Sequence, residues 1–404
     1  MAHRGPMTER VPFAGMRRGS AEYRRASLAL FLAGNATFSL LYCVQPLLPE
    51  FAREFGLAPA GASLALSLTS GALAVAVFLA GAIGQAMPRR SLMLGSLIAA
   101  SLLNLVAGVA THWPWLVAAR LLEGVALGGV PAVAMAYIAE EMHPADLVKA
   151  MGLYVAGTAF GGMMGRFATG WFTEFGSWRI ALGAMGGLGL AAALGFGLLL
   201  PSSRRFVPQR GLGWAHHRAV WWRLMQDNGL LRLFFIAFAL MSVFVTLFNY
   251  VGFRLVRPPF SLGHGAISAI FLTYISGIFS SSITGHMTEA WGRRPVLAMG
   301  LVAMLGGALL TLSGALPLIV LGILLLTLGF FSAHAAASGW VGQWAGPDKG
   351  HAASLYLLFY YLGAGITGTA GGWFYQHWQW PGVVALTGGI CAAGLGVALS
   401  LRPR

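Results

Sequence analysis

Charged side chains are scarce in this chain: only 9% of its 404 residues are Asp, Glu, Lys or Arg, whereas 57% are hydrophobic. A soluble domain has about a quarter charged and about half apolar residues. The shortage of charge therefore excludes a soluble globular protein. It indicates a chain that spends most of its length inside a lipid bilayer.

Cysteine is almost absent, since Cys43 and Cys391 are the only two and each falls within an apolar run. Two such cysteines exclude a disulfide framework and a thiolate metal site. The ten histidines are scattered, without a paired metal-ligand or paired-acid pattern. We therefore expect no metal, no cofactor and no enzymatic centre, and a membrane enzyme is only the second class of function considered.

Acidic residues are also few, with 12 Asp and Glu against 26 Lys and Arg and a net charge of +14. Such an excess could indicate nucleic-acid binding. Twenty of the 26 basic residues, however, fall in one alternate set of loops and tails, and only four fall in the other set. This positive-inside pattern predicts that both termini are cytoplasmic, and no nucleic-acid partner is expected.

Long apolar runs occupy most of the chain. Because about 20 apolar residues cross the hydrocarbon layer, cutting the runs at turn residues predicts twelve transmembrane helices. Ten-residue alternation, the mark of a membrane β-barrel, is missing. The predicted helices span residues 26–49, 61–86, 91–110, 115–139, 147–172, 180–200, 230–253, 264–288, 295–313, 317–341, 351–374 and 382–401.

Two stretches of the chain come into register when the sequence is shifted by 202 residues. They are "AMGLYVAGTAFGGMMGRFATGWF" from Ala150 and "AASLYLLFYYLGAGITGTAGGWF" from Ala352. The repeat predicts an all-α integral membrane protein with two pseudo-symmetric six-helix bundles. Its parts are a cytoplasmic basic tail (1–25), an N-terminal bundle (26–200), a cytoplasmic linker (201–229) and a C-terminal bundle (230–404).

A second repeat relates "GAIGQAMPRRS" from Gly81 to "GHMTEAWGRRP" from Gly285. We expect Gly81 and Gly285 to end helices, and the arginines to cap helix ends and pair with acids of the opposite half. Gln85, in place of an acid, predicts weaker pairing in the first half. Alternatively, the arginines only enforce topology. The expected cytoplasmic gate comprises Gly81, Arg89, Arg90, Glu140, Glu141, Gly285, Glu289, Arg293 and Arg294.

Only three Asp, Glu, Lys or Arg side chains fall at membrane depth: Arg120, Glu123 and Arg166. Such residues are candidates for function, because an unpaired charge in the bilayer is costly. Arg120 and Glu123 are three residues apart and can pair. We expect both arginines to face a cavity and contact an anionic or hydrogen-bonding part of a substrate, with Glu123 carrying a proton. A permanently closed salt bridge, or an Arg166 that reaches the headgroups, is the alternative.

Neutral polar residues at depth are weaker candidates for the same pathway, since each more often serves interhelical hydrogen bonding. Glycines recur every three or four residues in the repeated helices, a spacing that allows close helix packing. The polar candidates are Asn35, Tyr42, Gln45, Asn249, Tyr250 and His334. The packing candidates are Gly157, Gly161, Gly165 and Gly363.

The loop repeat resembles the G-x-x-x-D-x-x-G-R-R signature of the major facilitator superfamily. "RLLEGVALGG" from Arg120 is similar to its helix 4 signature, and "GTAFGGMMGR" from Gly157 to its helix 5 antiporter signature. In the latter, Gly162 replaces a proline and Arg166 the last glycine. Further stretches such as "QPLLPEF" and "LFNYVGFRL" resemble the acriflavine-sensitivity, YnfM-like branch. The resemblance implies a mid-membrane cavity lined by helices 1, 4, 7 and 10.

A secondary active transporter is therefore the leading class of function. We expect a monomer in the inner membrane that moves a small polar or amphiphilic molecule by alternating access, with proton-coupled efflux as the first mode and proton-coupled import as the alternative. Helix 1 carries no acid in its span, which favours neutral, zwitterionic or anionic substrates. A sensor or scaffold is disfavoured, because the tail and linker are too short for an output domain.

Overall fold

The structure is a computed structural model that describes residues 15–83, 87–205 and 213–401. The described part is almost entirely helical and contains no β-strand. Its α-helices are α1 (Ala21–Tyr42), α2 (Leu48–Glu54), α3 (Pro59–Ile83), α4 (Arg89–Gly108), α5 (Trp113–Leu127), α6 (Gly129–Glu141), α7 (Leu147–Glu174), α8 (Trp178–Leu199), α9 (Trp214–Met225), α10 (Asn228–Leu255), α11 (His264–Ala269), α12 (Tyr274–Trp291), α13 (Arg293–Leu310), α14 (Leu316–Trp344) and α15 (Lys349–Ser400). Short 3-10 turns are η1 (Gln45–Leu47), η3 (Pro144–Asp146), η4 (Ile270–Thr273) and η5 (Gly346–Asp348).

Eleven stretches of the described residues are long and apolar enough to cross a membrane. The last of them, Gly346–Ser400, has 55 residues, which is about 80 Å of helix and far more than one crossing needs. Gln379 interrupts α15 with a left-handed φ of 53°, and Pro381 follows it. The described chain therefore has twelve crossing segments, which confirms the predicted number.

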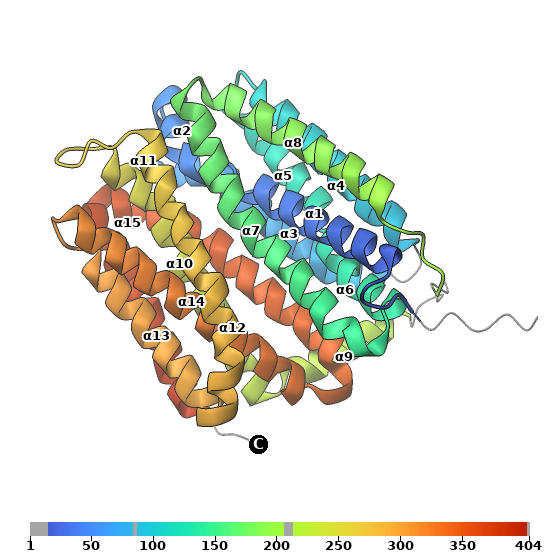
Figure 1. Cartoon of the computed structure of the whole chain (residues 1–404). Helices are drawn as coiled ribbons and strands as arrows, with labels where there is room; N and C mark the ends of the chain where they lie inside the picture. The colour runs from blue at the N-terminus through green and yellow to red at the C-terminus, as the bar shows by residue number, and fades with distance from the viewer. Residues whose placement is uncertain (1–14, 84–86, 206–212, 402–404) are drawn as a thin grey trace, which may run out of the picture.

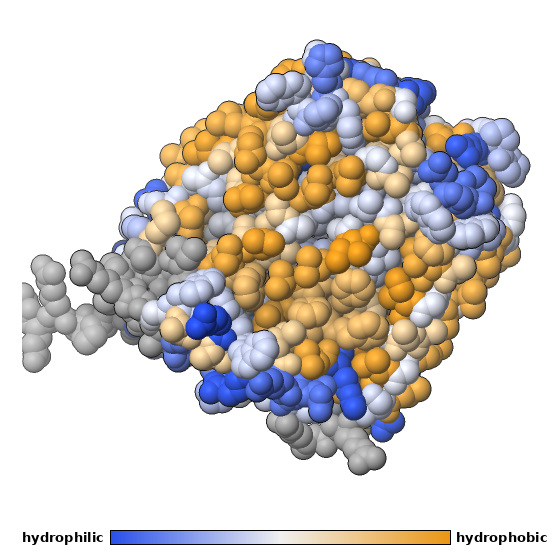
Figure 2. Space-filling model, turned by 180° about the vertical axis from the view of Figure 1, so that it is seen from behind, coloured by the Kyte–Doolittle hydropathy of each residue, from blue (hydrophilic) through white to orange (hydrophobic). Residues whose placement is uncertain are grey.

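The helices form two bundles, one from α1 to α8 and the other from α10 to α15 (Figure 1). A broad apolar surface separates more polar regions at opposite ends of the molecule (Figure 2). We call the end that holds Arg89, Arg293 and α9 the basic end, and the end that holds Glu50, Glu174 and His264 the distal end. The apolar surface is what a bilayer requires of the residues that it surrounds.

Equivalent hydrogen bonds link the repeated helices in the two bundles. Ser39 Oγ of α1 donates to the carbonyl of Gly161 in α7, at 2.9 Å. Ser242 Oγ of α10 donates to the carbonyl of Gly363 in α15, at 3.3 Å. Gly161 and Gly363 are mates under the 202-residue shift, so the duplication seen in the sequence is also a duplication of contacts.

Two helices that the sequence predicts as continuous are broken. The first ends at Tyr42 and resumes through η1 and α2, and the fourth divides into α5 and α6 at Gly128. Pro46 and Pro131 explain both breaks, because proline has no N–H for the carbonyl four residues earlier and its ring collides with that carbonyl. The first break places Gln45 on a 3-10 turn in the interior of the molecule.

The expectation that Gly81 and Gly285 end their helices is wrong. Gly81 lies within α3, and α12 continues past Gly285 to Trp291. The residue that ends α12 is Gly292, with φ 82°. Glycine suits this place because a left-handed residue after the last helical turn costs it little. Gln85 and its predicted effect lie outside the described residues.

The linker contains a helix that the sequence analysis did not predict. One face of α9 is buried at the basic end, with Trp221 4.2 Å from the ring centroid of Phe78. His217 Nδ1 lies 2.9 Å from His351 Nε2 of α15. The linker helix therefore contacts residues of both bundles.

Glycines bring α1 and α7 into backbone contact. A Cβ atom added to Gly157 would lie 2.6 Å from the carbonyl oxygen of Phe31, and one added to Gly165 would lie 2.6 Å from Ser39 Cα. A Cβ on Gly161 would collide with the backbone of Asn35. Gly363 makes a matching approach to Phe238 in the other bundle. These close approaches leave no room for a side chain.

We predict that Gly161→Ala destabilises the protein by about 1–3 kcal/mol, because the added methyl group overpacks the α1–α7 contact. Gly152→Ala is the matched control on the same helix, since a Cβ there meets nothing within 4 Å. Thermal unfolding of the purified protein followed by size-exclusion chromatography checks this. Equal melting midpoints for the two variants would contradict the packing role of Gly161.

Candidate functional site

Arg166 lies on α7, is 1% exposed and points toward the boundary between the two bundles. Its Nε donates to Gln45 Oε1, and its Nη1 donates to the carbonyl oxygen of Gly162. The guanidinium carbon lies 3.8 Å from the ring centroid of Tyr42 and 4.8 Å from that of Tyr274. Tyr42 belongs to the N-terminal bundle and Tyr274 to the C-terminal bundle, so Arg166 contacts both.

Gln45 connects Arg166 to the opposite bundle. Its Oε1 accepts from Arg166, while its Nε2 donates to Asn249 Oδ1 of α10 at 2.5 Å. Gln45 and Asn249 are each 1% exposed. The three side chains thus form one buried hydrogen-bonded chain across the boundary, here called the central polar chain. Four of the sequence candidates, these three and Tyr42, are brought together.

No carboxylate in the described part of the chain neutralises Arg166. Within the described residues, no Asp or Glu oxygen lies within 4.0 Å of its guanidinium. Burying an unpaired ion costs several kcal/mol, whereas each cation–π contact contributes about 0.5–2 kcal/mol. Aromatic rings and two hydrogen bonds therefore offset only part of the cost. The surroundings of Arg166 favour the arrival of a negative charge.

Gly162 and Arg166, the two residues that differ from the helix 5 antiporter signature, contact each other. Gly162 supplies the carbonyl oxygen for Arg166 Nη1, and a Cβ on Gly162 would lie 3.3 Å from that nitrogen. A proline there would put a ring beside the guanidinium. At the repeat position, Gly368 has no side chain, and its carbonyl accepts instead from the Tyr250 hydroxyl at 2.6 Å.

Arg120 and Glu123 form a second buried charge site. Both are 0% exposed, and Arg120 Nη1 lies 2.6 Å from Glu123 Oε2, so their predicted pairing is confirmed. Arg120 also donates to the carbonyl oxygens of Leu40, Leu41 and Ala65 and to Asn104 Oδ1. All these partners belong to the N-terminal bundle. Arg120 is therefore held inside one bundle in this conformation. The expectation that it faces the same space as Arg166 is not met.

Glu123 retains one free acceptor, because its buried Oε1 has no hydrogen-bond partner. Asn35 likewise has a buried Oδ1 without a partner. His334 is bonded, since its Nδ1 lies 3.0 Å from the Tyr356 hydroxyl. Its ring also lies 4.8 Å from that of Tyr360. The remaining polar candidates thus fall at separate places around the central polar chain.

At the basic end, the expected gate residues pair within their own bundle. Arg89 Nη2 lies 3.0 Å from Glu140 Oε1, and Arg90 donates to the carbonyl of Gly197. Glu141 accepts from the backbone nitrogens of residues 204 and 205, at 2.7 and 2.8 Å. The expected pairs between opposite bundles are not formed among these residues in this conformation.

The expected gate residues of the C-terminal bundle form fewer hydrogen bonds and ion pairs than those of the N-terminal bundle. Arg294 donates to the carbonyl of Leu399. Arg293 Nη1 is buried without a partner, although it lies near Gly339. Glu289 is exposed on α12. Among the described residues of this set, Arg293 Nη1 is thus left without a hydrogen bond, whereas Arg294 is bonded within the C-terminal bundle.

Contacts that close the distal end were not anticipated from the sequence. Glu50 Oε1 lies 3.1 Å from His264 Nε2, and Glu174 accepts from the backbone nitrogen of Gly265 at 2.7 Å. Both join the N-terminal bundle to the start of α11. Toward the basic end, α7 and α12 diverge (Figure 1). The acidic residues of the distal loops are the sequence feature from which these contacts could have been predicted.

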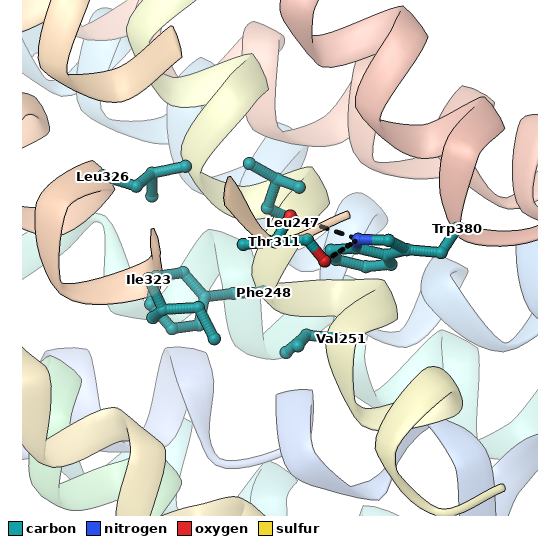
Figure 3. Close-up of a pocket in the computed structure, with 7 residues that line it drawn as sticks. All are labelled: Leu247, Phe248, Val251, Thr311, Ile323, Leu326 and Trp380. Atoms are coloured by element: carbon teal, nitrogen blue, oxygen red, sulfur yellow. Dashed lines mark hydrogen bonds between the residues drawn. The ribbon is translucent and has the colours of Figure 1, made fainter. Parts of the chain in front are cut away.

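Small pockets lie elsewhere in the C-terminal bundle. A void of about 10 Å³ is lined by Phe248, Ile323 and Trp380 among others, and Trp380 Nε1 donates to the carbonyl and hydroxyl oxygens of Thr311, each at 3.1 Å (Figure 3). A void of this size holds no more than about one water molecule. A pocket of 240 Å³ at the distal end includes Arg254 and Arg257. Neither lies at Arg166.

Two repeated six-helix bundles with a charged, buried boundary define a membrane transport protein of duplicated architecture. Residues 28–282 and 257–404 match the model of the Major Facilitator Superfamily. The chain belongs to the major facilitator superfamily.

Known relatives share nearly the whole chain. It is 43% identical to the inner membrane transport protein YnfM of Escherichia coli (strain K12), over 96% of this chain and 93% of that protein. It is 41% identical to the MFS-type transporter YybF of Bacillus subtilis (strain 168), over 92% of each. The solved nucleoside transporter NupG has the same fold, with a TM-score of 0.79 and 15% identity over 93% of this chain and 99% of that one.

We predict that Gln45→Leu shifts the conformational equilibrium away from the closed distal end by about 5- to 100-fold. Leucine leaves Arg166 Nε and Asn249 Oδ1 without their partner, and an unsatisfied buried group costs about 1–3 kcal/mol. Electron spin resonance distances between labels at the exposed Phe175 and Leu312 positions measure the change.

Gln226→Leu, at the end of α9 and far from the central polar chain, serves as the control. It should leave the label distances unchanged. A Gln45→Leu protein with the distances of the parent would show that the central polar chain does not stabilise the closed state.

Proposed function

We propose that the protein is a secondary active transporter that moves a small anionic or hydrogen-bonding molecule by alternating access. The central polar chain of Arg166, Gln45 and Asn249 is the observation that carries this proposal. It joins two bundles at a buried cation that no acid neutralises. Repeated bundles of this kind transport by rocking about a site between them.

In the proposed cycle, closure at the distal end alternates with closure at the basic end. Contacts of Glu50 with His264 and of Glu174 with Gly265 support the first state. Gate pairs between bundles, drawn from Arg89, Arg293 and Glu289 and their neighbours, would form in the second. Breaking the hydrogen bonds of the central polar chain is the step that would let the protein pass from the first state to the second.

We infer that the basic end faces the cytoplasm. In the sequence, 20 of the 26 basic residues fall in the tail, the linker and the set of alternate loops to which Arg89 and Arg293 belong, and the positive-inside rule assigns such a set to the cytoplasm. The name of the relative YnfM places that protein in the inner membrane, and the same location is proposed here. The tail 1–25, the bundles 26–200 and 230–404 and the linker 201–229 are the proposed working parts of a monomer.

Arg166 is the proposed substrate-contacting residue. Its Nε and Nη1 donate to neutral oxygens, and its guanidinium faces the rings of Tyr42 and Tyr274. An oxyanion would supply the negative charge that these partners lack. A cationic substrate would be repelled by the same group.

Glu123 is the proposed proton carrier, and efflux in exchange for protons is the proposed mode. Its unpartnered Oε1 and its single ion pair with Arg120 support this role. If the Arg120 side chain moves away from Glu123 within the N-terminal bundle, the carboxylate loses its counter-ion, and binding a proton would remove the unpaired charge. Proton-coupled import uses the same parts in the opposite direction, so the direction requires a flux measurement.

Purified protein in liposomes tests the proposal directly. Adding a transported solute to one side should move protons across the membrane in proportion to solute flux. Absence of solute flux for every compound of a broad panel, with and without a pH gradient, would contradict the transporter function.

We predict that Glu123→Gln abolishes flux driven by a pH gradient while substrate binding changes less than about threefold. Glutamine keeps the shape and an acceptor for Arg120 but carries no titratable proton. Glu22→Gln, which removes an exposed acid paired with Arg204 at the basic end, is the control. Proton-driven flux equal to that of the parent in Glu123→Gln would remove this residue from the coupling mechanism.

A further inference from the structure

Aromatic rings continue from Arg166 along the boundary of the bundles. The ring of Tyr274 lies 5.3 Å from that of Phe244, which stacks on Phe330 at 3.8 Å. Phe330 in turn stacks on His334 at 5.9 Å, and His334 lies 4.8 Å from Tyr360. These five residues form what we call the aromatic column.

Both bundles contribute to the space beside the aromatic column. Tyr42 of α1 faces the column across the boundary, because the guanidinium carbon of Arg166 lies 3.8 Å from the Tyr42 ring centroid and 4.8 Å from that of Tyr274. Tyr360 and His334 are partly exposed, although each lies in the middle of its helix. Since their rings contact Phe330 and one another rather than the outer surface, the exposure indicates space between the bundles.

One polar atom beside Arg166 lacks a partner. Among the described residues, the Tyr274 hydroxyl is buried without a hydrogen bond, and the Tyr274 ring centroid lies 4.8 Å from the guanidinium carbon of Arg166. An unsatisfied buried polar atom costs about 1–3 kcal/mol, so such atoms are seldom left without a purpose. The Tyr274 hydroxyl therefore provides a donor for a polar molecule at this boundary.

We propose that the substrate is an aromatic carboxylate, a small molecule whose carboxylate binds Arg166 and whose planar ring packs against the aromatic column. This inference rests on the proposed transport function and adds the chemistry of the transported solute. Rings pack against other rings with more stabilisation than their area alone provides. The carboxylate supplies the charge that the buried guanidinium lacks.

Two other ligand chemistries fit less well. Aromatic cages can bind organic cations, but the nearest charge here is Arg166, and the only acid at membrane depth is paired with Arg120. A saturated carboxylate would satisfy Arg166 but would gain no ring contact. The combination of one cation and a row of rings is what selects a ring-bearing anion.

Four probes separate these chemistries: benzoate, cyclohexanecarboxylate, benzamide and benzyltrimethylammonium. Binding to the purified full-length protein is measured by isothermal titration calorimetry. Benzoate should bind about three- to tenfold more tightly than cyclohexanecarboxylate because of the ring. It should bind about ten- to a hundredfold more tightly than benzamide because of the charge.

Substitutions assign each of these two binding preferences to a residue. Each preference is measured as a ratio of two affinities of the same protein sample, so a partial loss of folded protein does not change it. Arg166→Gln should abolish the preference for benzoate over benzamide. Tyr360→Leu should abolish the preference for benzoate over cyclohexanecarboxylate. Arg257→Gln on the distal surface and Phe279→Leu, 66% exposed on α12, should leave both ratios unchanged.

Equal binding of benzoate and cyclohexanecarboxylate, tighter binding of benzyltrimethylammonium, or binding of none of the four would overturn the inference. Counterflow of other solutes in liposomes separates this failure from failure of the proposed function. If another solute is exchanged, the transporter remains and only the substrate class is wrong. If none is exchanged but benzoate binds with both preferences, the ligand class stands and the transport function fails.

Discussion

A guanidinium group buried at a boundary between two bundles, with no acid beside it, is the constraint from which the rest of the molecule follows. Arg166 is stabilised by Gln45, by the Gly162 carbonyl and by the faces of Tyr42 and Tyr274. Those partners come from both bundles. A rearrangement that separates the bundles must therefore replace some of these contacts, and a bound anion is the replacement that also removes the uncompensated charge.

The sequence duplication explains the helix contacts that the two bundles share. The position at which the repeats differ holds the buried charge. Ser39 with Gly161 and Ser242 with Gly363 repeat one helix contact in each half. Arg166 has no counterpart, because its repeat position is Gly368, whose carbonyl accepts from Tyr250. The same position of the fold thus closes a neutral contact in one half and holds a buried cation in the other. Asymmetry at this point allows the two halves to differ in what they bind.

The second buried charge is organised differently. Arg120 is surrounded by carbonyl oxygens of its own bundle and by Glu123, so its positive charge is neutralised locally. Only the free Oε1 of Glu123 remains unsatisfied. One charge site therefore lies at the boundary between the bundles and the other inside a single bundle. The proposed function assigns substrate contact to the first site and proton coupling to the second.

From the sequence alone, the twelve crossings, the duplication and the Arg120–Glu123 pair could be predicted, because apolar length, repeat register and i, i+3 spacing are local properties of the chain. The sequence could also have predicted that α12 ends at Gly292, because glycine is the residue that most easily adopts the left-handed backbone after a last helical turn. The loop repeat pointed instead to Gly285. Only the tertiary structure decided that Arg166 bonds to Gln45, 121 positions away, and that Gln45 bonds to Asn249, 204 positions away. Contacts between bundles depend on how two rigid bodies dock, and no local pattern encodes that geometry.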